Sequence, residues 1–219
     1  REDRDATEGC VLAATEGEFA AIVAVNCETD FVAMNADFVG MTKSILDAAV
    51  ANKAADLESL KGITVGDRTV TDLVTDRMGV TGEKMELNVY EHLSAPTVVA
   101  YIHPGNKLAS IVGFNKANVD TQVAKDFAMQ IAAMNPVALV AEEVSEEIKQ
   151  RELNLAREKA IEAGKPENLL DRIAEGALQK FYKEFTLLQQ EFVTIAQYLK
   201  EHDKDLTVTS FKRFTLNAE

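Results

Sequence analysis

Cysteine is scarce in this sequence, since only Cys10 and Cys27 occur among its 219 residues. Two cysteines provide neither a disulfide framework nor the ligand spacing of a zinc site. No histidine or run of basic residues lies beside either one. We therefore expect both to be small apolar residues of the core rather than nucleophiles.

The sequence has neither a long apolar run nor an excess of positive charge. No run approaches the roughly 18 apolar residues of a membrane-spanning helix, and the charged residues 1–5 cannot be the apolar part of a signal peptide. Lys and Arg number 23 against 36 Asp and Glu, a net charge of −13. Because phosphate backbones and anionic lipids bind proteins mainly through Lys and Arg, nucleic acid and membrane surfaces are poor candidate partners.

Recognisable nucleotide-binding and catalytic motifs are missing as well. None of the eleven glycines belongs to a phosphate-binding loop or a dinucleotide fingerprint. The histidines, His92, His103 and His202, are far apart and lack the spacing of metal ligands. Paired carboxylates are uninformative in so acidic a chain. These patterns favour a binding protein over an enzyme, and they predict no cofactor, no metal site and no direct nucleotide binding.

What the sequence does contain is typical of a folded protein. Its hydrophobic content of 47% with 27% charged residues lies in the globular range. Residues 10–27 form two apolar runs around Gly17, which predicts a β-hairpin. Both alternate sets of residues in the second run are apolar, so we expect this strand to be central and covered on both faces. A helix follows over 36–52, with Asn35 as its N-cap.

Further elements follow along the chain. The polar stretch 53–83 contains one shorter helix, whose apolar stripe consists of Val70, Leu73, Val74 and Met78. Three β-type runs at 84–93, 97–103 and 107–115 are separated by turn residues, which favours an antiparallel meander. A helix over 119–134 ends before Pro136.

The last part of the sequence changes character. Dense charged residues on both sides of Gly164-Lys165-Pro166 predict two antiparallel helices, a helical hairpin inserted between sheet elements. We then expect a short helix through Tyr198 and Leu199 and a final strand. The strand's apolar residues are Leu206, Val208, Phe211 and Phe214.

Several segments resemble one family. Directly after the predicted central strand, residues 25–33 read VNCETDFVA, and residues 128–136 read AMQIAAMNP. Then come Gly-Lys-Pro at 164–166, KFYKE at 180–184 with LLQQ at 187–190, and FKRF at 211–214. In this order the segments resemble elongation factor Ts, the guanine-nucleotide exchange factor for elongation factor Tu.

The resemblance implies an α+β fold with two related subdomains, each an antiparallel sheet packed against helices. Residues 1–96 are then the N-terminal core subdomain and residues 97–219 the C-terminal one, with an antiparallel coiled-coil arm inserted at about 143–186. Family members usually open with a small ubiquitin-associated-like domain and a basic linker. Residues 1–9 resemble the end of that linker, so we expect this chain to lack the domain and to bind its partner more weakly.

The resemblance also implies an exchange site. In the family, the Asp and Phe of the Thr-Asp-Phe-Val motif enter the GTPase near its magnesium ion. The motif matches Thr29, Asp30, Phe31 and Val32 here, so the resemblance implies that Asp30 and Phe31 form the exchange wedge. For Thr29 we expect a local role, with its hydroxyl bonding to nearby backbone. From base rates alone, a Phe between a strand and a helix is usually core, and the resemblance reverses that expectation.

Secondary contacts follow from the same resemblance. Met78 and Gly79 match a position that touches the GTPase, and the alternative is a helix C-terminus finished by glycine. His103 matches a histidine at the same interface, with a solvated loop histidine as the alternative. The loop at 104–110 departs from the family pattern, so its contacts do not carry over.

These observations predict an exchange factor for elongation factor Tu in a cytoplasm of bacterial type, with an organelle as the alternative location. It would disturb the magnesium and nucleotide site without covalent chemistry. A homodimer or a 2:2 assembly through the core or the arm is a further expectation. The alternatives are a non-catalytic, chaperone-like partner of the same GTPase and an unrelated enzyme on the same scaffold.

Overall fold

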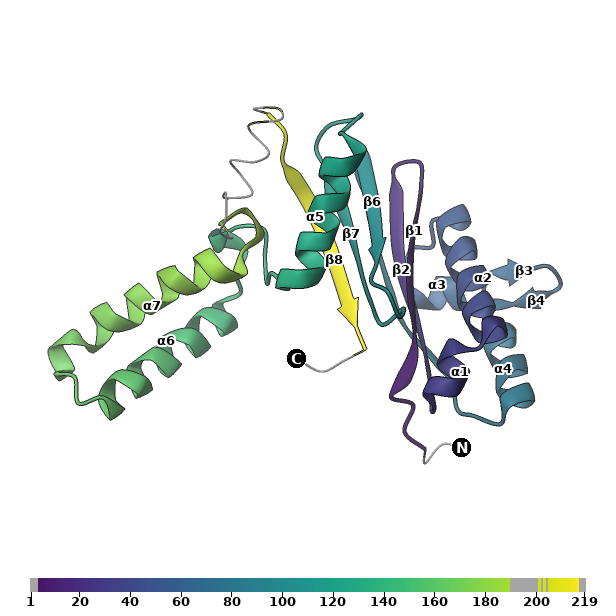
Figure 1. Cartoon of the computed structure of the whole chain (residues 1–219), viewed down its shortest axis with the longest axis horizontal. Coiled ribbons are helices and arrows are strands. Elements are labelled where there is room, and N and C mark those ends of the chain that lie inside the picture. Colours follow the sequence, from purple (N-terminus) through teal and green to yellow (C-terminus); the bar gives the residue numbers. More distant parts are fainter. Residues whose placement is uncertain (1–3, 190–200, 202, 204, 217–219) are drawn as a thin grey trace. The chain divides into compact units, whose positions relative to one another are not determined.

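The structure, a computed structural model, describes residues 4–189, 201, 203 and 205–216 (Figure 1). It combines helices with antiparallel sheets, so the predicted α+β class is confirmed. The chain divides into two compact units. The first comprises Arg1–Ala133 with Val208–Glu219, and the second comprises Met134–Thr207.

The first sheet of the first unit has the strand order β1-β2-β5 and is antiparallel. Its strands are β1 (Glu8–Glu16), β2 (Phe19–Cys27) and β5 (Glu86–Ser94). The predicted hairpin is therefore confirmed, and its second arm, β2, is the central strand. Gly17 turns the hairpin with φ 59°, a left-handed conformation that favours glycine.

Strand β2 is buried on both faces, as the sequence predicts. One set of alternate residues packs with the helices, namely Phe19, Ala21, Val23 and Val25. The other set packs against the second sheet, namely Ala20, Ile22 and Ala24. Strand β2 therefore lies between helices on one side and the second sheet on the other.

Four helices accompany the first sheet: α1 (Asp30–Met34), α2 (Ala36–Asn52), α3 (Leu57–Lys61) and α4 (Val70–Thr81). A small hairpin of β3 (Thr64–Val65) and β4 (Arg68–Thr69) precedes α4. The predicted N-cap of α2 is confirmed, since the Asn35 side chain accepts a hydrogen bond of 2.9 Å from Asp37 N.

Helix α4 ends later than the alternative interpretation of Gly79 required. Gly79 lies inside the helix, and the left-handed cap is Gly82, with φ 75°. The interpretation of Gly79 as a helix C-terminus is therefore wrong. The physical reason is that Gly82, whose N–H bonds to Met78 O at 2.9 Å, provides the left-handed residue that ends the helix.

The second sheet has the order β6-β7-β8 and is also antiparallel. Its strands are β6 (Thr97–Ile102), β7 (Leu108–Phe114) and β8 (Val208–Thr215), and α5 (Thr121–Met134) lies along it in Figure 1. Helix and sheet are joined by a hydrogen bond of 2.6 Å from Ser110 Oγ to Ala128 O. The rings of Phe114 and Phe127 pack edge to face, 5.8 Å apart.

The predicted three-stranded meander is wrong in one pairing. β6 and β7 pair as expected, but β5 pairs with β2 rather than with β6. The turn at Ser94–Pro96 reverses the chain, yet it carries the chain from one sheet to the other. Turn residues indicate that the chain reverses, but they do not determine which strand the following strand pairs with. The boundary predicted at residue 96 falls at this crossing, but both sheets belong to the first compact unit. The two related subdomains stay a prediction.

The second unit is mainly helical. Helices α6 (Glu146–Glu162) and α7 (Leu170–Phe185) pack against each other as a hairpin within the segment predicted for it (Figure 1). Short 3-10 turns flank them at Ala141–Glu143, Glu167–Leu169 and Leu187–Gln189. The core of this unit includes Ala138, Val144, Leu178 and Tyr182. The expected helix through Tyr198 and Leu199 lies outside the described residues.

Candidate functional site

The Thr29–Val32 segment, which we call the TDFV turn, leaves the end of β2 and begins α1. Thr29 is the N-cap of this five-residue helix, and its Oγ1 accepts a hydrogen bond of 3.3 Å from Val32 N. Its carbonyl accepts a second bond, of 3.1 Å, from Ala33 N. The expected local role of the Thr29 hydroxyl is confirmed.

A carboxylate from a distant part of the chain braces this turn. Glu83 Oε1 accepts hydrogen bonds from Glu28 N at 3.1 Å and from Thr29 N at 3.0 Å. Its second oxygen, Oε2, accepts one of 2.6 Å from Thr29 Oγ1. In return, Glu28 Oε1 accepts a bond of 2.6 Å from Lys84 N. That bond, followed by the charge of Arg4, lowers the pKa of the Glu28 carboxyl. The end of β2 is thereby joined to the segment that follows α4.

Phe31 points away from the protein. Its side chain is 85% exposed, whereas Val32, the next residue, packs against the core. The base-rate expectation that Phe31 belongs to the core is therefore wrong. Asp30 is also exposed and lies in the first turn of α1, where a carboxylate is favourable. The turn is thus held by its backbone and by Val32, while Asp30 and Phe31 face outward.

Two more large apolar side chains are exposed on neighbouring helices. Met34 on α1 is 78% exposed and Val80 in the last turn of α4 is 73% exposed. The two helices lie near each other in Figure 1, and the Glu83 bonds to Thr29 come three residues after Val80. Single exposed apolar residues are ordinary, whereas a contiguous patch of them is typical of a surface that a partner covers.

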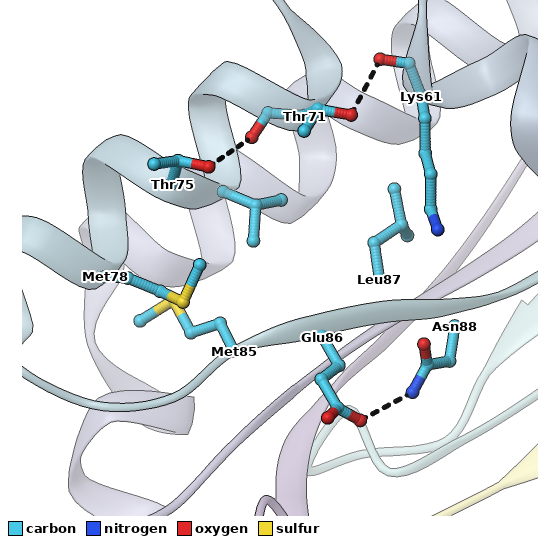
Figure 2. A pocket seen from close by; sticks show the side chains of 9 residues that line it. Lys61, Thr71, Thr75, Met78, Met85, Glu86, Leu87 and Asn88 are labelled. Atoms are coloured by element: carbon cyan, nitrogen blue, oxygen red, sulfur yellow. Dashed lines mark hydrogen bonds between the residues drawn. The ribbon is translucent and has the colours of Figure 1, made fainter. Parts of the chain in front are cut away.

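Met78 and Gly79 are neighbours on α4 but differ in exposure. Met78 is half-buried and lines a groove of about 310 Å³ between α4 and β5, shown in Figure 2. The groove is also lined by Lys61, Thr71, Val74, Thr75, Met85, Glu86, Leu87 and Asn88. Gly79 is exposed, and a Cβ added there would meet no atom within 4 Å.

Comparison with known proteins decides the family. The sequence model described as Elongation factor TS matches residues 28–218. The chain belongs to the elongation factor Ts family. Elongation factor Ts of Porphyromonas gingivalis is 60% identical over 225 residues, covering all of this chain and 82% of that protein. Elongation factor Ts of Azobacteroides pseudotrichonymphae is 55% identical, with the same coverage. That of Bacteroides fragilis is 43% identical over 281 residues, covering all of this chain and 85% of the relative.

The remaining residue that the elongation factor Ts resemblance singled out is His103. It is exposed at the turn between β6 and β7, where its N–H bonds to Leu108 O at 2.8 Å. Its ring Nδ1 lies 2.9 Å from Tyr101 Oη. Among the described residues, no hydrogen bond or ion pair joins His103 to the TDFV turn. The structure brings Thr29 and the end of α4 together and leaves His103 on another element.

The two thiols of this elongation factor Ts family member are inert core groups. Cys10 and Cys27 are free and fully buried. Burial raises the pKa of Cys10 to about 11 and that of Cys27 to about 12. Within the described part of the chain, no group of three or more His, Cys, Asp or Glu side chains could hold a metal ion. No described helix is long and apolar enough to cross a membrane.

Glu83 is the site residue that sequence reasoning missed. It lies 54 residues beyond Thr29, and nothing in its neighbourhood distinguishes it from the other acidic residues of the chain. No local pattern identifies Glu83, because the N–H groups that it binds belong to residues 28 and 29.

Proposed function

We propose that this protein is a guanine-nucleotide exchange factor that binds elongation factor Tu and promotes GDP release during translation elongation. It acts by binding, with no covalent chemistry, in a cytoplasm of bacterial type. Membership of the elongation factor Ts family supports the role in elongation. The observation that carries the finer proposal is Phe31, an aromatic side chain that is 85% exposed on a turn held by four hydrogen bonds to backbone and hydroxyl groups.

The energy available from Phe31 is large enough to matter. Full burial of a Phe side chain in an apolar slot contributes about 1.5–3 kcal/mol. Since each 1.4 kcal/mol is about tenfold in an equilibrium constant, this side chain alone supplies a factor of about ten to one hundred and fifty. In the complex, Asp30 beside it brings a negative charge close to the magnesium site of the GTPase.

The proposed mechanism rests on the coordination chemistry of magnesium. Mg²⁺ requires near-octahedral geometry and bridges nucleotide phosphates in GTPases. A wedge that shifts the surrounding helices of the GTPase weakens the ion and the nucleotide together. The coupling is reciprocal. The exchange protein lowers the affinity of the GTPase for nucleotide, and nucleotide lowers the affinity of the GTPase for the exchange protein in the same ratio. That reciprocity lets one molecule of exchange factor act repeatedly.

The secondary contacts extend the same surface. We assign Met78 and Gly79 on α4, with the exposed Val80 beside them, to the GTPase interface together with the wedge. His103 is a further contact on a separate element. A homodimer or a 2:2 complex with elongation factor Tu, through the core or the helical hairpin, is part of the proposal and is measured by light scattering of the free protein and of the complex.

The test is stopped-flow release of a fluorescent GDP analogue from elongation factor Tu, with excess unlabelled GDP, in the presence and absence of this protein. We expect acceleration by the wild type and a loss of about tenfold or more with Phe31→Ala. Met129→Ala is the matched control, because Met129 is 48% exposed on α5 and lies outside the proposed interface.

Each other outcome has a definite meaning. Binding without acceleration would replace this proposal by the non-catalytic, chaperone-like partner of the same GTPase. Acceleration that Phe31→Ala leaves intact would keep the function and reject the wedge. Absence of both binding and acceleration would reject elongation factor Tu as the partner.

A further inference from the structure

We propose that Glu83 is a positioning residue of the exchange reaction: its carboxylate fixes the TDFV turn so that Phe31 is presented to the partner in one orientation. The inference rests on the proposed function and adds to it a residue of another element, the segment between α4 and β5. Its basis is the set of three hydrogen bonds that Glu83 accepts from Glu28 N, Thr29 N and Thr29 Oγ1.

The backbone groups that Glu83 binds have no partner in the sheet or in the helix. Strand β2 ends at Cys27, so the N–H groups of residues 28 and 29 lie beyond the β ladder. They also precede α1, whose first N–H groups have no acceptor within the helix. A carboxylate is a strong acceptor for such groups, because charge-assisted hydrogen bonds are about twice as strong as neutral ones.

The contact continues from Glu83 into α1. The Thr29 hydroxyl donates to Glu83 Oε2 at 2.6 Å and accepts from Val32 N at 3.3 Å. The Glu83 carboxylate therefore determines how the hydroxyl is oriented, and the hydroxyl in turn caps the helix that carries Phe31. This chain of bonds ends one residue from the wedge.

Glu83 is itself held on both sides. Its N–H bonds to Thr81 Oγ1 at 3.2 Å, directly after the Gly82 cap of α4. The next residue, Lys84, donates its N–H to Glu28 Oε1 at 2.6 Å, so the two segments exchange hydrogen bonds in both directions. The end of α4 and the TDFV turn are thus one fixed unit, which places the wedge at a set distance from Met78 and Gly79.

The short helix α1 depends on these bonds. A helix of five residues is far below the length at which helices are stable alone. Phe31 contributes little to holding it, because its side chain is 85% exposed. Without Glu83, Val32 and Ala33 still anchor the turn in the core, but the entry into α1 loses the bonds that orient it. We therefore expect a protein that folds and presents its wedge poorly.

The decisive experiment is a double-mutant cycle in the GDP-release assay with Glu83→Ala and Phe31→Ala. If Glu83 acts through the wedge, Glu83→Ala lowers the maximal release rate about tenfold or more in the wild-type background. In the Phe31→Ala background it lowers the rate less than twofold, because no wedge remains to be positioned. Equal losses in both backgrounds would overturn the inference, and so would a Glu83→Ala protein as active as the wild type.

The matched control is Glu91→Ala. Glu91 lies further along β5, and its carboxylate pairs with Lys212 Nζ at 3.7 Å rather than with the TDFV turn. We expect wild-type exchange from this variant. A loss equal to that of Glu83→Ala would show that any lost negative charge in this region slows exchange, and the positioning role would be rejected.

A second measurement separates positioning from folding and needs no partner. Amide hydrogen exchange of the free protein reports the N–H groups of Glu28 and Thr29 directly. We expect both to lose protection in Glu83→Ala and in the milder Glu83→Gln, while the amides of β2 keep theirs. Unchanged protection at residues 28 and 29 would overturn the inference. If the wild type fails to accelerate GDP release at all, the proposed function fails on that arm alone, and this readout still decides whether Glu83 holds the turn.

Discussion

Gly79 occupies a position where glycine is a poor choice for stability. It lies inside α4 (Val70–Thr81), where glycine is less favourable than alanine by about 0.5–1 kcal/mol. A Cβ at this position meets no atom within 4 Å, so the fold itself does not require glycine. We expect Gly79→Ala to raise the free energy of unfolding by about 0.5–1 kcal/mol. For a chain of this length that corresponds to a shift of the melting temperature by about 1–4 °C.

The same substitution should weaken binding to elongation factor Tu. If the partner approaches α4 closely at Gly79, the added methyl group overpacks the interface at a cost of about 1–3 kcal/mol. The dissociation constant then rises by about 5- to 150-fold. Urea denaturation of the free protein and titration calorimetry with nucleotide-free elongation factor Tu measure the two effects separately. The predicted result is a variant that is more stable and binds less well.

Gly40→Ala is the control for this prediction. Gly40 lies inside α2 and is exposed, and a Cβ added there would also meet no atom within 4 Å. It should give the same gain in stability without loss of affinity. A destabilised Gly79→Ala protein would refute the helix-propensity argument. A stabilised variant with unchanged affinity would refute the placement of Gly79 at the interface.

Three further predictions concern the core. A Cβ at Gly113 in β7 would lie 2.7 Å from Ala95 Cβ and 3.3 Å from Leu93 Cδ1. Gly113→Ala should therefore lower the free energy of unfolding, measured by urea denaturation, by about 1–3 kcal/mol. An unchanged denaturation midpoint would contradict the close approach of the two sheets. Burial holds the thiol pKa values of Cys10 and Cys27 at about 11 and 12, so both should react slowly with Ellman's reagent at pH 8 in the folded state and quickly in guanidinium. Because unfolding lowers these pKa values, the unfolded state loses the protons first, and stability should fall as the pH rises from about 9 through the folded pKa values. A Cys10→Ala, Cys27→Ala protein should show a flatter dependence, and rapid labelling of the folded wild type would count against burial.

Much of the fold could be predicted because its signals are local. The apolar residues on both faces of β2 indicate a central strand within nine positions, and the Asn35 cap is visible two residues from the N–H that it binds. Helix α1 was not predicted, because five residues are too few to show a helical period. The partner of β5 was predicted wrongly, since choosing between β2 and β6 depends on contacts between distant segments.

The candidate site likewise combines local features, which the sequence indicates, with long-range contacts, which it does not. The TDFV motif could be found in the sequence because its four residues are contiguous, and the cap formed by Thr29 is a local effect. The exposure of Phe31 could not be derived from composition, which favours a core position, and depended on the resemblance. Glu83 was missed because its bonds to the turn span more than fifty positions of chain. A hydrogen-bonded contact between residues so far apart produces no recognisable pattern in a single sequence.

The discontinuity of the first compact unit has a consequence during synthesis. Strand β8 closes the second sheet, yet it is made only after the whole of the second unit, Met134–Thr207, has been translated. Until then β7 has an open edge on a ribosome-bound chain, with its N–H and C=O groups available to other strands. The first sheet contains only strands from residues up to Ser94 and can be complete much earlier. Newly made chains should therefore carry a finished TDFV turn while they still depend on chaperones or on rapid elongation to protect the edge of β7.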